Sequence, residues 1–212
     1  MHTNIFIFGD SMSFGCWDAA GGWAQRLNNF LVERFLLSNG KEFYTYNLSI
    51  SGNQTQDIIA RMELELKPRQ SEGGANIIIF AIGVNDSAFV HSKNDHWVPF
   101  AEFENNLQEL IVLAQKYSNK IFFLGLPMIN QETVDPMPWD TDKSYRNEYV
   151  KKYDQALQIT AKGFGVGYIP LFDRFAAADY KKLLHDGAHP NAAGHEMIFD
   201  TVRDYLLGKK II

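Results

Sequence analysis

The chain has 212 residues, of which 46% are hydrophobic and 14% aromatic, and this length supports one sizeable core rather than two. Its formal net charge of −5 leaves no excess of Lys and Arg to neutralise a phosphate backbone, so we expect no nucleic-acid partner. The single cysteine, Cys16, can form no intrachain disulfide and supplies no cluster of thiolate ligands.

The first residues and the apolar runs bear on where the protein resides. The chain begins Met-His-Thr-Asn and enters a short apolar run, without the basic segment and long apolar stretch of a secretion signal. No stretch approaches the roughly 20 consecutive apolar residues that a membrane span requires. We therefore expect a cytoplasmic protein with no membrane span, folded as a single domain over residues 1–212.

Short β-rich runs alternate along the chain with stretches of helical periodicity. The expected strands cover residues 5–8, 44–48, 77–82, 121–126 and 166–169. Apolar residues three and four apart predict amphipathic helices over residues 23–35, 103–114, 149–159 and 197–206. This alternation is typical of an α/β fold, in which a parallel sheet is covered by helices on both faces.

The first motif directly follows the first expected strand, where residues 9–15 read Gly-Asp-Ser-Met-Ser-Phe-Gly. It places the hydroxyl of Ser11 at the carboxyl end of a strand, the edge at which open parallel sheets collect ligands. The flanking glycines permit a tight turn, which predicts an exposed Ser11 side chain. The motif is neither a Gly-x-Ser-x-Gly elbow nor a phosphate loop, and by itself it also fits helix capping by Asp10 or Ser11.

Two polar turns follow the second and third expected strands. Residues 51–53 read Ser-Gly-Asn, and residues 83–86 read Gly-Val-Asn-Asp. Acyl transfer develops negative charge on a carbonyl oxygen, and rigid N–H donors stabilise that charge. Gly52 can offer a backbone N–H and Asn85 a side-chain amide, although each turn alone is ordinary. Because the carboxyl ends of parallel strands meet at one edge, we expect both donors to lie near Ser11.

Two loops, residues 87–99 and 127–143, should overhang Ser11 from the third and fourth strands. We expect four of their apolar side chains to contact substrate: Phe89, Trp97, Met128 and Trp139. The second loop also carries four carboxylates, those of Glu132, Asp135, Asp140 and Asp142. Lys143 is its only basic residue. This local negative charge is expected to repel anionic head groups.

The last motif lies near the end of the chain, where residues 185–191 read His-Asp-Gly-Ala-His-Pro-Asn. Asp186 and His189 can form the carboxylate–imidazole pair that a serine nucleophile needs as its base. The same residues also fit a helix-entry turn. A metal site drawing on His185, His189 and His195 is disfavoured, because the proline after His189 interrupts a helix of the His-x-x-x-His type. We expect no metal and no cofactor.

Taken in order, the motifs resemble those of the SGNH (GDSL-type) hydrolases, whose four blocks carry a serine, a glycine, an asparagine and a histidine. Block one matches around Ser11, with methionine in place of the usual leucine at residue 12. The other blocks match Ser-Gly-Asn-Gln-Thr around Gly52, Gly-Val-Asn-Asp around Asn85 and Asp-Gly-Ala-His-Pro-Asn around His189. The second block is the loosest match. The resemblance implies a flavodoxin-like three-layer sandwich with five parallel strands in the order 2-1-3-4-5.

The resemblance also implies a role for each of these residues. Ser11 would be the nucleophile, with Asp186 and His189 as its acid–base partners. The N–H groups of Ser11 and Gly52 and the amide of Asn85 would form the oxyanion hole. No catalytic residue is missing, which disfavours a non-catalytic binding module on the same fold.

We therefore expect a serine esterase that cleaves a small-molecule ester through an acyl-enzyme and prefers short, uncharged acyl esters. A carbohydrate O-acetylesterase, with sugars stacked on Trp97 or Trp139, is one alternative; a lysophospholipase or thioesterase of the same family is another. A phosphate-binding protein on the same sheet is disfavoured, since residues 9–15 contain no Lys or Arg. No feature of the sequence points to an oligomeric state.

Overall fold

The five predicted apolar runs form one parallel sheet, in a computed structural model that describes residues 2–38, 40–70 and 73–212. The strand order is β2-β1-β3-β6-β8, and each neighbouring pair is parallel. The strands are β1 (Thr3–Gly9), β2 (Phe43–Asn47), β3 (Ala75–Ala81), β6 (Ile121–Leu124) and β8 (Gly167–Ile169). Counted within this sheet alone, the order is the expected 2-1-3-4-5, so the predicted fold class is confirmed.

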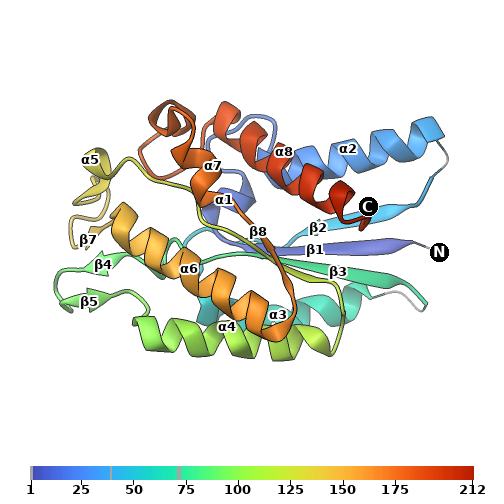
Figure 1. Cartoon of the computed structure of the whole chain (residues 1–212), viewed down its shortest axis with the longest axis horizontal. Helices are drawn as coiled ribbons and strands as arrows, with labels where there is room; N and C mark the ends of the chain where they lie inside the picture. Colours follow the sequence, from blue (N-terminus) through green and yellow to red (C-terminus); the bar gives the residue numbers. More distant parts are fainter. Residues whose placement is uncertain (1, 39, 71–72) are drawn as a thin grey trace.

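Long helices cover both faces of the sheet (Figure 1). On one face lie α2 (Gly22–Ser38) and α8 (Ala192–Gly208), and on the other lie α3 (Thr55–Leu66), α4 (Phe100–Gln115) and α6 (Asn147–Phe164). The shorter elements are α1 (Ser11–Phe14), α5 (Gln131–Val134), α7 (Phe172–Ala176) and the 3₁₀ turns η1 (Lys67–Arg69) and η2 (Tyr180–Leu183). None of the described helices is both long and apolar enough to cross a membrane.

The sequence periodicity predicts α2, α4, α6 and α8 but not α3. In α3 the buried apolar residues are Ile58, Met62 and Leu66, which is one per turn among Arg and Glu side chains. Such a narrow stripe gives little periodic signal, because a helix is usually identified by apolar pairs at spacings of three and four.

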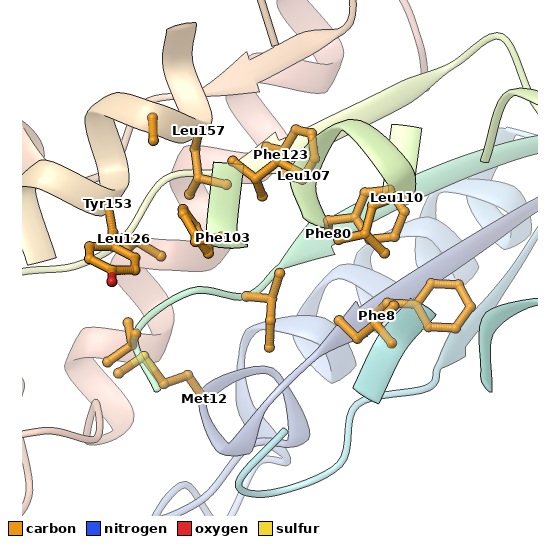
Figure 2. Packing of buried hydrophobic residues seen from close by; sticks show 14 of the residues in the cluster. Phe8, Met12, Phe80, Phe103, Leu107, Leu110, Phe123, Leu126, Tyr153 and Leu157 are labelled. Carbon is orange, nitrogen blue, oxygen red and sulfur yellow. The ribbon is translucent and has the colours of Figure 1, made fainter. Parts of the chain in front are cut away.

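The core lies in two layers, one on each face of the sheet. Ile5 and Ile7 of β1 pack with the α2 and α8 side chains, whereas Phe6 and Phe8 pack with those of α3, α4 and α6. Figure 2 shows part of the second layer, in which Phe8, Phe80 and Phe123 of neighbouring strands pack with helix residues such as Leu107 and Leu110. Because the central strands β1, β3 and β6 are buried on both faces, their sequences are largely continuous apolar runs, whereas the edge strand β2 has no buried residue.

The two loops expected to overhang Ser11 carry a small antiparallel sheet of order β5-β4-β7. Its strands are β4 (Phe89–Val90), β5 (Asp95–His96) and β7 (Lys143–Ser144). The small sheet lies at the end of the molecule to which β1 runs (Figure 1). Strands of two residues have no measurable alternation, so the sequence could not predict them.

Candidate active site

Ser11 is the first residue of α1 and directly follows the turn that ends β1. Asp10 caps this short helix, since its Oδ1 accepts a hydrogen bond of 2.9 Å from the backbone N–H of Met12. Gly15 ends α1 with φ 96°, and a Cβ there would lie 2.4 Å from the carbonyl oxygen of Gly21, so only glycine fits. The expected exposed serine is in fact 7% exposed, because the walls of a cleft rise around it.

A chain of hydrogen bonds joins Ser11 to the loop before α8. The Oγ of Ser11 lies 2.9 Å from Nε2 of His189, and Nδ1 of His189 lies 2.8 Å from Oδ2 of Asp186. Burial acts to raise the pKa of Asp186, but hydrogen bonds from the His189 side chain and backbone outweigh it and hold that pKa well below its usual range. An ionised Asp186 fixes the proton on Nδ1, which leaves Nε2 to accept the proton of the Ser11 hydroxyl.

Local interactions hold the Asp186–His189 loop in place. The other carboxylate oxygen of Asp186, Oδ1, accepts hydrogen bonds from the backbone N–H groups of Ala188 at 3.0 Å and His189 at 2.8 Å. Gly187 has φ 95°, and a Cβ there would lie 1.9 Å from Oγ1 of Thr133, so a side chain is excluded. Asn191 then caps α8 through its side-chain oxygen. The carboxylate and imidazole are therefore oriented before any substrate arrives.

Three residues that line the cleft carry N–H groups available for a further hydrogen bond. Ser11, Gly52 and Asn85 all line it. Within the described part of the chain, the backbone N–H groups of Ser11 and Gly52 donate to no other residue. Asn85 uses one N–H of its amide to donate to the carbonyl oxygen of Asn53 at 2.9 Å, and the second N–H remains available. This arrangement can stabilise a negatively charged oxygen next to the Ser11 hydroxyl.

A buried carboxyl connects the two turns that supply these donors. Oδ1 of Asp86 accepts from the backbone N–H of Thr55 at 3.0 Å and from its hydroxyl at 2.6 Å. Asp86 follows Asn85, and Thr55 begins α3 just after Gly52, so this contact ties one turn to the other. Burial raises the pKa of Asp86 to about 7 and that of Asp10, beside Ser11, to about 6.

The cleft has a volume of about 200 Å³, and its lining includes side chains that were not predicted to contact a substrate. Trp97 and Trp139 line it as expected, together with Ser51, Met137, Asp140, Lys143 and Tyr145. Met137, Asp140 and Lys143 belong to the loop that was predicted to overhang Ser11, so the position of that loop could have indicated that they line the cleft. Tyr145 lies two residues beyond the loop, and nothing in the sequence indicated its place in the cleft.

Two of the four apolar loop residues do not line this cleft. Phe89 packs against the rings of His91 and His96, with centroids 5.5 and 5.9 Å away. Met128 packs against the buried hydrophobic cores on both faces of the sheet. Only Trp97 and Trp139 are therefore retained as residues placed to contact a substrate.

Most of the expected negative charge of the second loop is neutralised by ion pairs, two of them with residues outside the loop. Asp135 pairs with Arg146 at 2.6 Å and Glu132 with Lys181 at 2.7 Å. Asp140 pairs with Lys143 at 2.5 Å. Since three of the four carboxylates have a cationic partner, repulsion of anionic head groups no longer follows from this loop, and the expectation is withdrawn.

The histidines weighed as metal ligands have other surroundings. His195 is buried, with Nε2 3.0 Å from the carbonyl oxygen of Cys16, and His185 stacks on Trp17 with centroids 5.2 Å apart. Among residues 2–38, 40–70 and 73–212, no group of three or more His, Cys, Asp or Glu side chains is placed to hold a metal ion.

This chain is similar to one protein family and to several known proteins. A model of the GDSL-like lipase/acylhydrolase family matches residues 7–197. An isoamyl acetate-hydrolyzing esterase of Saccharomyces cerevisiae is 24% identical over 172 residues, which is 75% of this chain and 69% of the relative. A lipase/acylhydrolase from Enterococcus faecalis has a similar structure, with a TM-score of 0.75 and 19% identity over 99% of this chain and 97% of that one. An acetylxylan esterase from Geobacillus stearothermophilus has a TM-score of 0.70 and 17% identity over 95% and 92% of the two chains.

Proposed function

Because the chain belongs to the GDSL-like lipase/acylhydrolase family of ester-cleaving hydrolases, we propose that it hydrolyses short acyl esters with Ser11 as the nucleophile. The observation that carries this proposal is the hydrogen-bond chain from Ser11 through His189 to Asp186. Ser11 and His189 line a small cleft.

The geometry supports a two-step acyl transfer. His189 takes the proton of Ser11 as Oγ attacks the ester carbonyl, and the N–H groups of Ser11, Gly52 and Asn85 stabilise the oxyanion. His189 then gives that proton to the leaving alcohol, and an acyl-enzyme on Ser11 results. Water attacks this acyl group with His189 again as the base, which releases the acid and restores Ser11. Asp186 stabilises the imidazolium in both steps.

The size of the cleft supports a short acyl group. Its volume of about 200 Å³ lies below the roughly 300–1,000 Å³ of sites that take drug-sized ligands. Met137 and Tyr145, which line the cleft with Ser11, are buried, so they leave little room for a long chain. The names of two of the similar proteins refer to acetyl esters, which is consistent with an acetyl or similarly short acyl substrate here.

A carbohydrate acetyl ester is the second candidate, and the exposed ring of Trp139 favours it. Trp139 is 51% exposed and lies 6.0 Å from the ring of His189. The ring of Trp97 is covered by the ammonium group of Lys143 at 3.8 Å. Trp139 is therefore the tryptophan with a ring available for stacking on the alcohol side of a sugar ester.

A chain-length series tests the proposal. We expect kcat/KM on p-nitrophenyl esters to be highest for acetyl to butyryl groups and to fall for octanoyl and longer chains. Rates that rise to long chains, or that are highest for acyl-CoA, would contradict the substrate class and leave the nucleophile untouched. For the sugar candidate, Trp139→Ala should raise KM for an acetylated monosaccharide more than for p-nitrophenyl acetate; equal changes would count against stacking.

A further inference from the structure

The side chain of Asn85 is held at both ends of its amide. Its Nδ2 donates to the carbonyl oxygen of Asn53 at 2.9 Å, and its Oδ1 accepts from the hydroxyl of Tyr145 at 2.7 Å. Asn85 and Tyr145 come from different parts of the fold, 60 residues apart, and both line the cleft beside Ser11. The contact with Tyr145 has no part in the reaction steps described above.

These two contacts permit only one orientation of the amide. The carbonyl oxygen of Asn53 can only accept a hydrogen bond, so Nδ2 must face it, since a flipped amide would bring two acceptor oxygens together. Oδ1 then faces Tyr145, and the second N–H of Nδ2 has no hydrogen-bond partner among the described residues. Asn85 is 8% exposed, so no bulk water competes freely for this arrangement.

The hydroxyl of Tyr145 is suited to act as the donor in this contact. Tyr145 is 5% exposed, and its backbone N–H is bound to the carbonyl oxygen of Val134 at 2.9 Å, which holds its main chain in place. Burial raises the pKa of Tyr145 far above its usual range, and the carboxylates of Asp10, Asp86 and Asp186 raise it further. The phenol therefore keeps its proton over the whole working pH range.

We propose that Tyr145 is a positioning residue for ester hydrolysis, whose hydroxyl holds the Asn85 amide so that its free N–H points at the oxyanion. This inference rests on the proposed function, because it assigns Asn85 to the oxyanion hole. A donor contributes to the rate only when it is aimed in advance at the developing charge. Without the Tyr145 hydroxyl, the Asn85 side chain keeps a single anchor at Asn53 and can rotate out of line.

The test is a double-mutant cycle on p-nitrophenyl acetate with Tyr145→Phe, Asn85→Ala and the double variant. Asn85→Ala should lower kcat by roughly 10²–10³-fold. Tyr145→Phe should lower kcat by about tenfold and change KM by less than about twofold, as for a group that acts mainly in the transition state. In the Asn85→Ala background, Tyr145→Phe should then cost less than about twofold, because its target is gone.

A matched control separates positioning from loss of a buried hydroxyl. Tyr153 is also buried, and its hydroxyl donates to the carbonyl oxygen of Val98 at 2.7 Å within the core layer around Phe103 (Figure 2). Tyr153→Phe should lower the unfolding temperature about as much as Tyr145→Phe and leave kcat near the wild-type value. Circular dichroism and thermal melting of each variant check that it is folded.

The outcomes distinguish the two proposals. A wild-type kcat for Tyr145→Phe, effects that multiply in the double variant, or an equal loss of kcat for Tyr153→Phe would each overturn the positioning role while leaving the hydrolase assignment intact. If Asn85→Ala itself keeps the wild-type kcat, the oxyanion-hole assignment of Asn85 fails, and the role of Tyr145 fails with it.

Discussion

The indole Nε1 of Trp17 donates a hydrogen bond of 3.1 Å to Oδ2 of Asp186, the same oxygen that lies 2.8 Å from Nδ1 of His189. Trp17 adopts φ 65°, a conformation uncommon for a residue with a side chain, and its ring stacks on His185. A shared acceptor oxygen means that the indole withdraws some of the carboxylate's negative charge from the imidazole. Trp17 thus affects the charge that Asp186 presents to His189, and its ring lies 6.4 Å from the ring of His189.

Trp17→Phe should retain the stacked ring and remove this donor. Because Asp186 would then offer more negative charge to His189, the acid limb of the kcat/KM profile should move to higher pH. The measurement is a pH–rate profile from pH 5 to 8 on an uncharged ester. A limb that stays in place, or moves to lower pH, would contradict the argument.

Ser11→Ala should abolish esterase activity and leave the fold intact. The residue removed is a single hydroxyl that faces the cleft and bonds only to His189 among the described residues, so the core loses no contact. Ester turnover and the thermal unfolding midpoint are measured on the same preparation. Activity above a trace, with contaminating esterase excluded, would mean that another group is the nucleophile.

Asp186→Asn should lower kcat by about 10⁴-fold, with KM far less affected. The amide can donate to Nδ1 and stabilise the wrong imidazole tautomer, and it cannot offset the charge of the imidazolium. Steady-state kinetics on p-nitrophenyl acetate supply both constants. Near-normal turnover would show that the carboxylate serves only as an acceptor for the backbone N–H groups of Ala188 and His189.

Asp86→Asn should change how stability depends on pH. Burial raises the pKa of Asp86 to about 7 in the folded protein, against 3.8 in the unfolded chain. The contribution of protonated Asp86 to the free energy of unfolding is therefore fully present below pH 3.8 and is lost as the pH rises through about 7. Asparagine carries no such charge. Relative to wild type, the free energy of unfolding of Asp86→Asn should therefore rise by about 1–3 kcal/mol from pH 5 to pH 8.

Urea titrations at the two pH values measure this difference directly. Most other titrating groups are common to both proteins and cancel in the comparison. The buried Asp10, whose pKa is raised to about 6, acts on Asp86 through its charge, so the measured difference reports Asp86 together with this coupling. Asp204→Asn, a change at an exposed position of α8, should follow the wild-type pH dependence. A constant difference between Asp86→Asn and wild type would show that Asp86 does not titrate in this range.

The sequence by itself determined the sheet and the local half of the site. Short β-rich runs predicted all five strands, and the central strands β1, β3 and β6 gave the clearest apolar signal because they are buried on both faces. Asp186 and His189 lie three residues apart in one loop, so their contact follows from local geometry. The resemblance of the four motifs to a known family then supplied the strand order and the residues that meet at the edge.

Only the tertiary structure decided the contacts between distant residues. Ser11 meets His189 across 178 positions, Trp17 meets Asp186 across 169, and Tyr145 meets Asn85 across 60. The same holds for the ion pairs of Glu132 and Asp135, whose cationic partners lie outside the loop that carries them. The physical reason is that a hydrogen bond or ion pair depends on where packing brings two side chains, and a tyrosine or tryptophan has the same local pattern whether it fills a core or orients a reacting group.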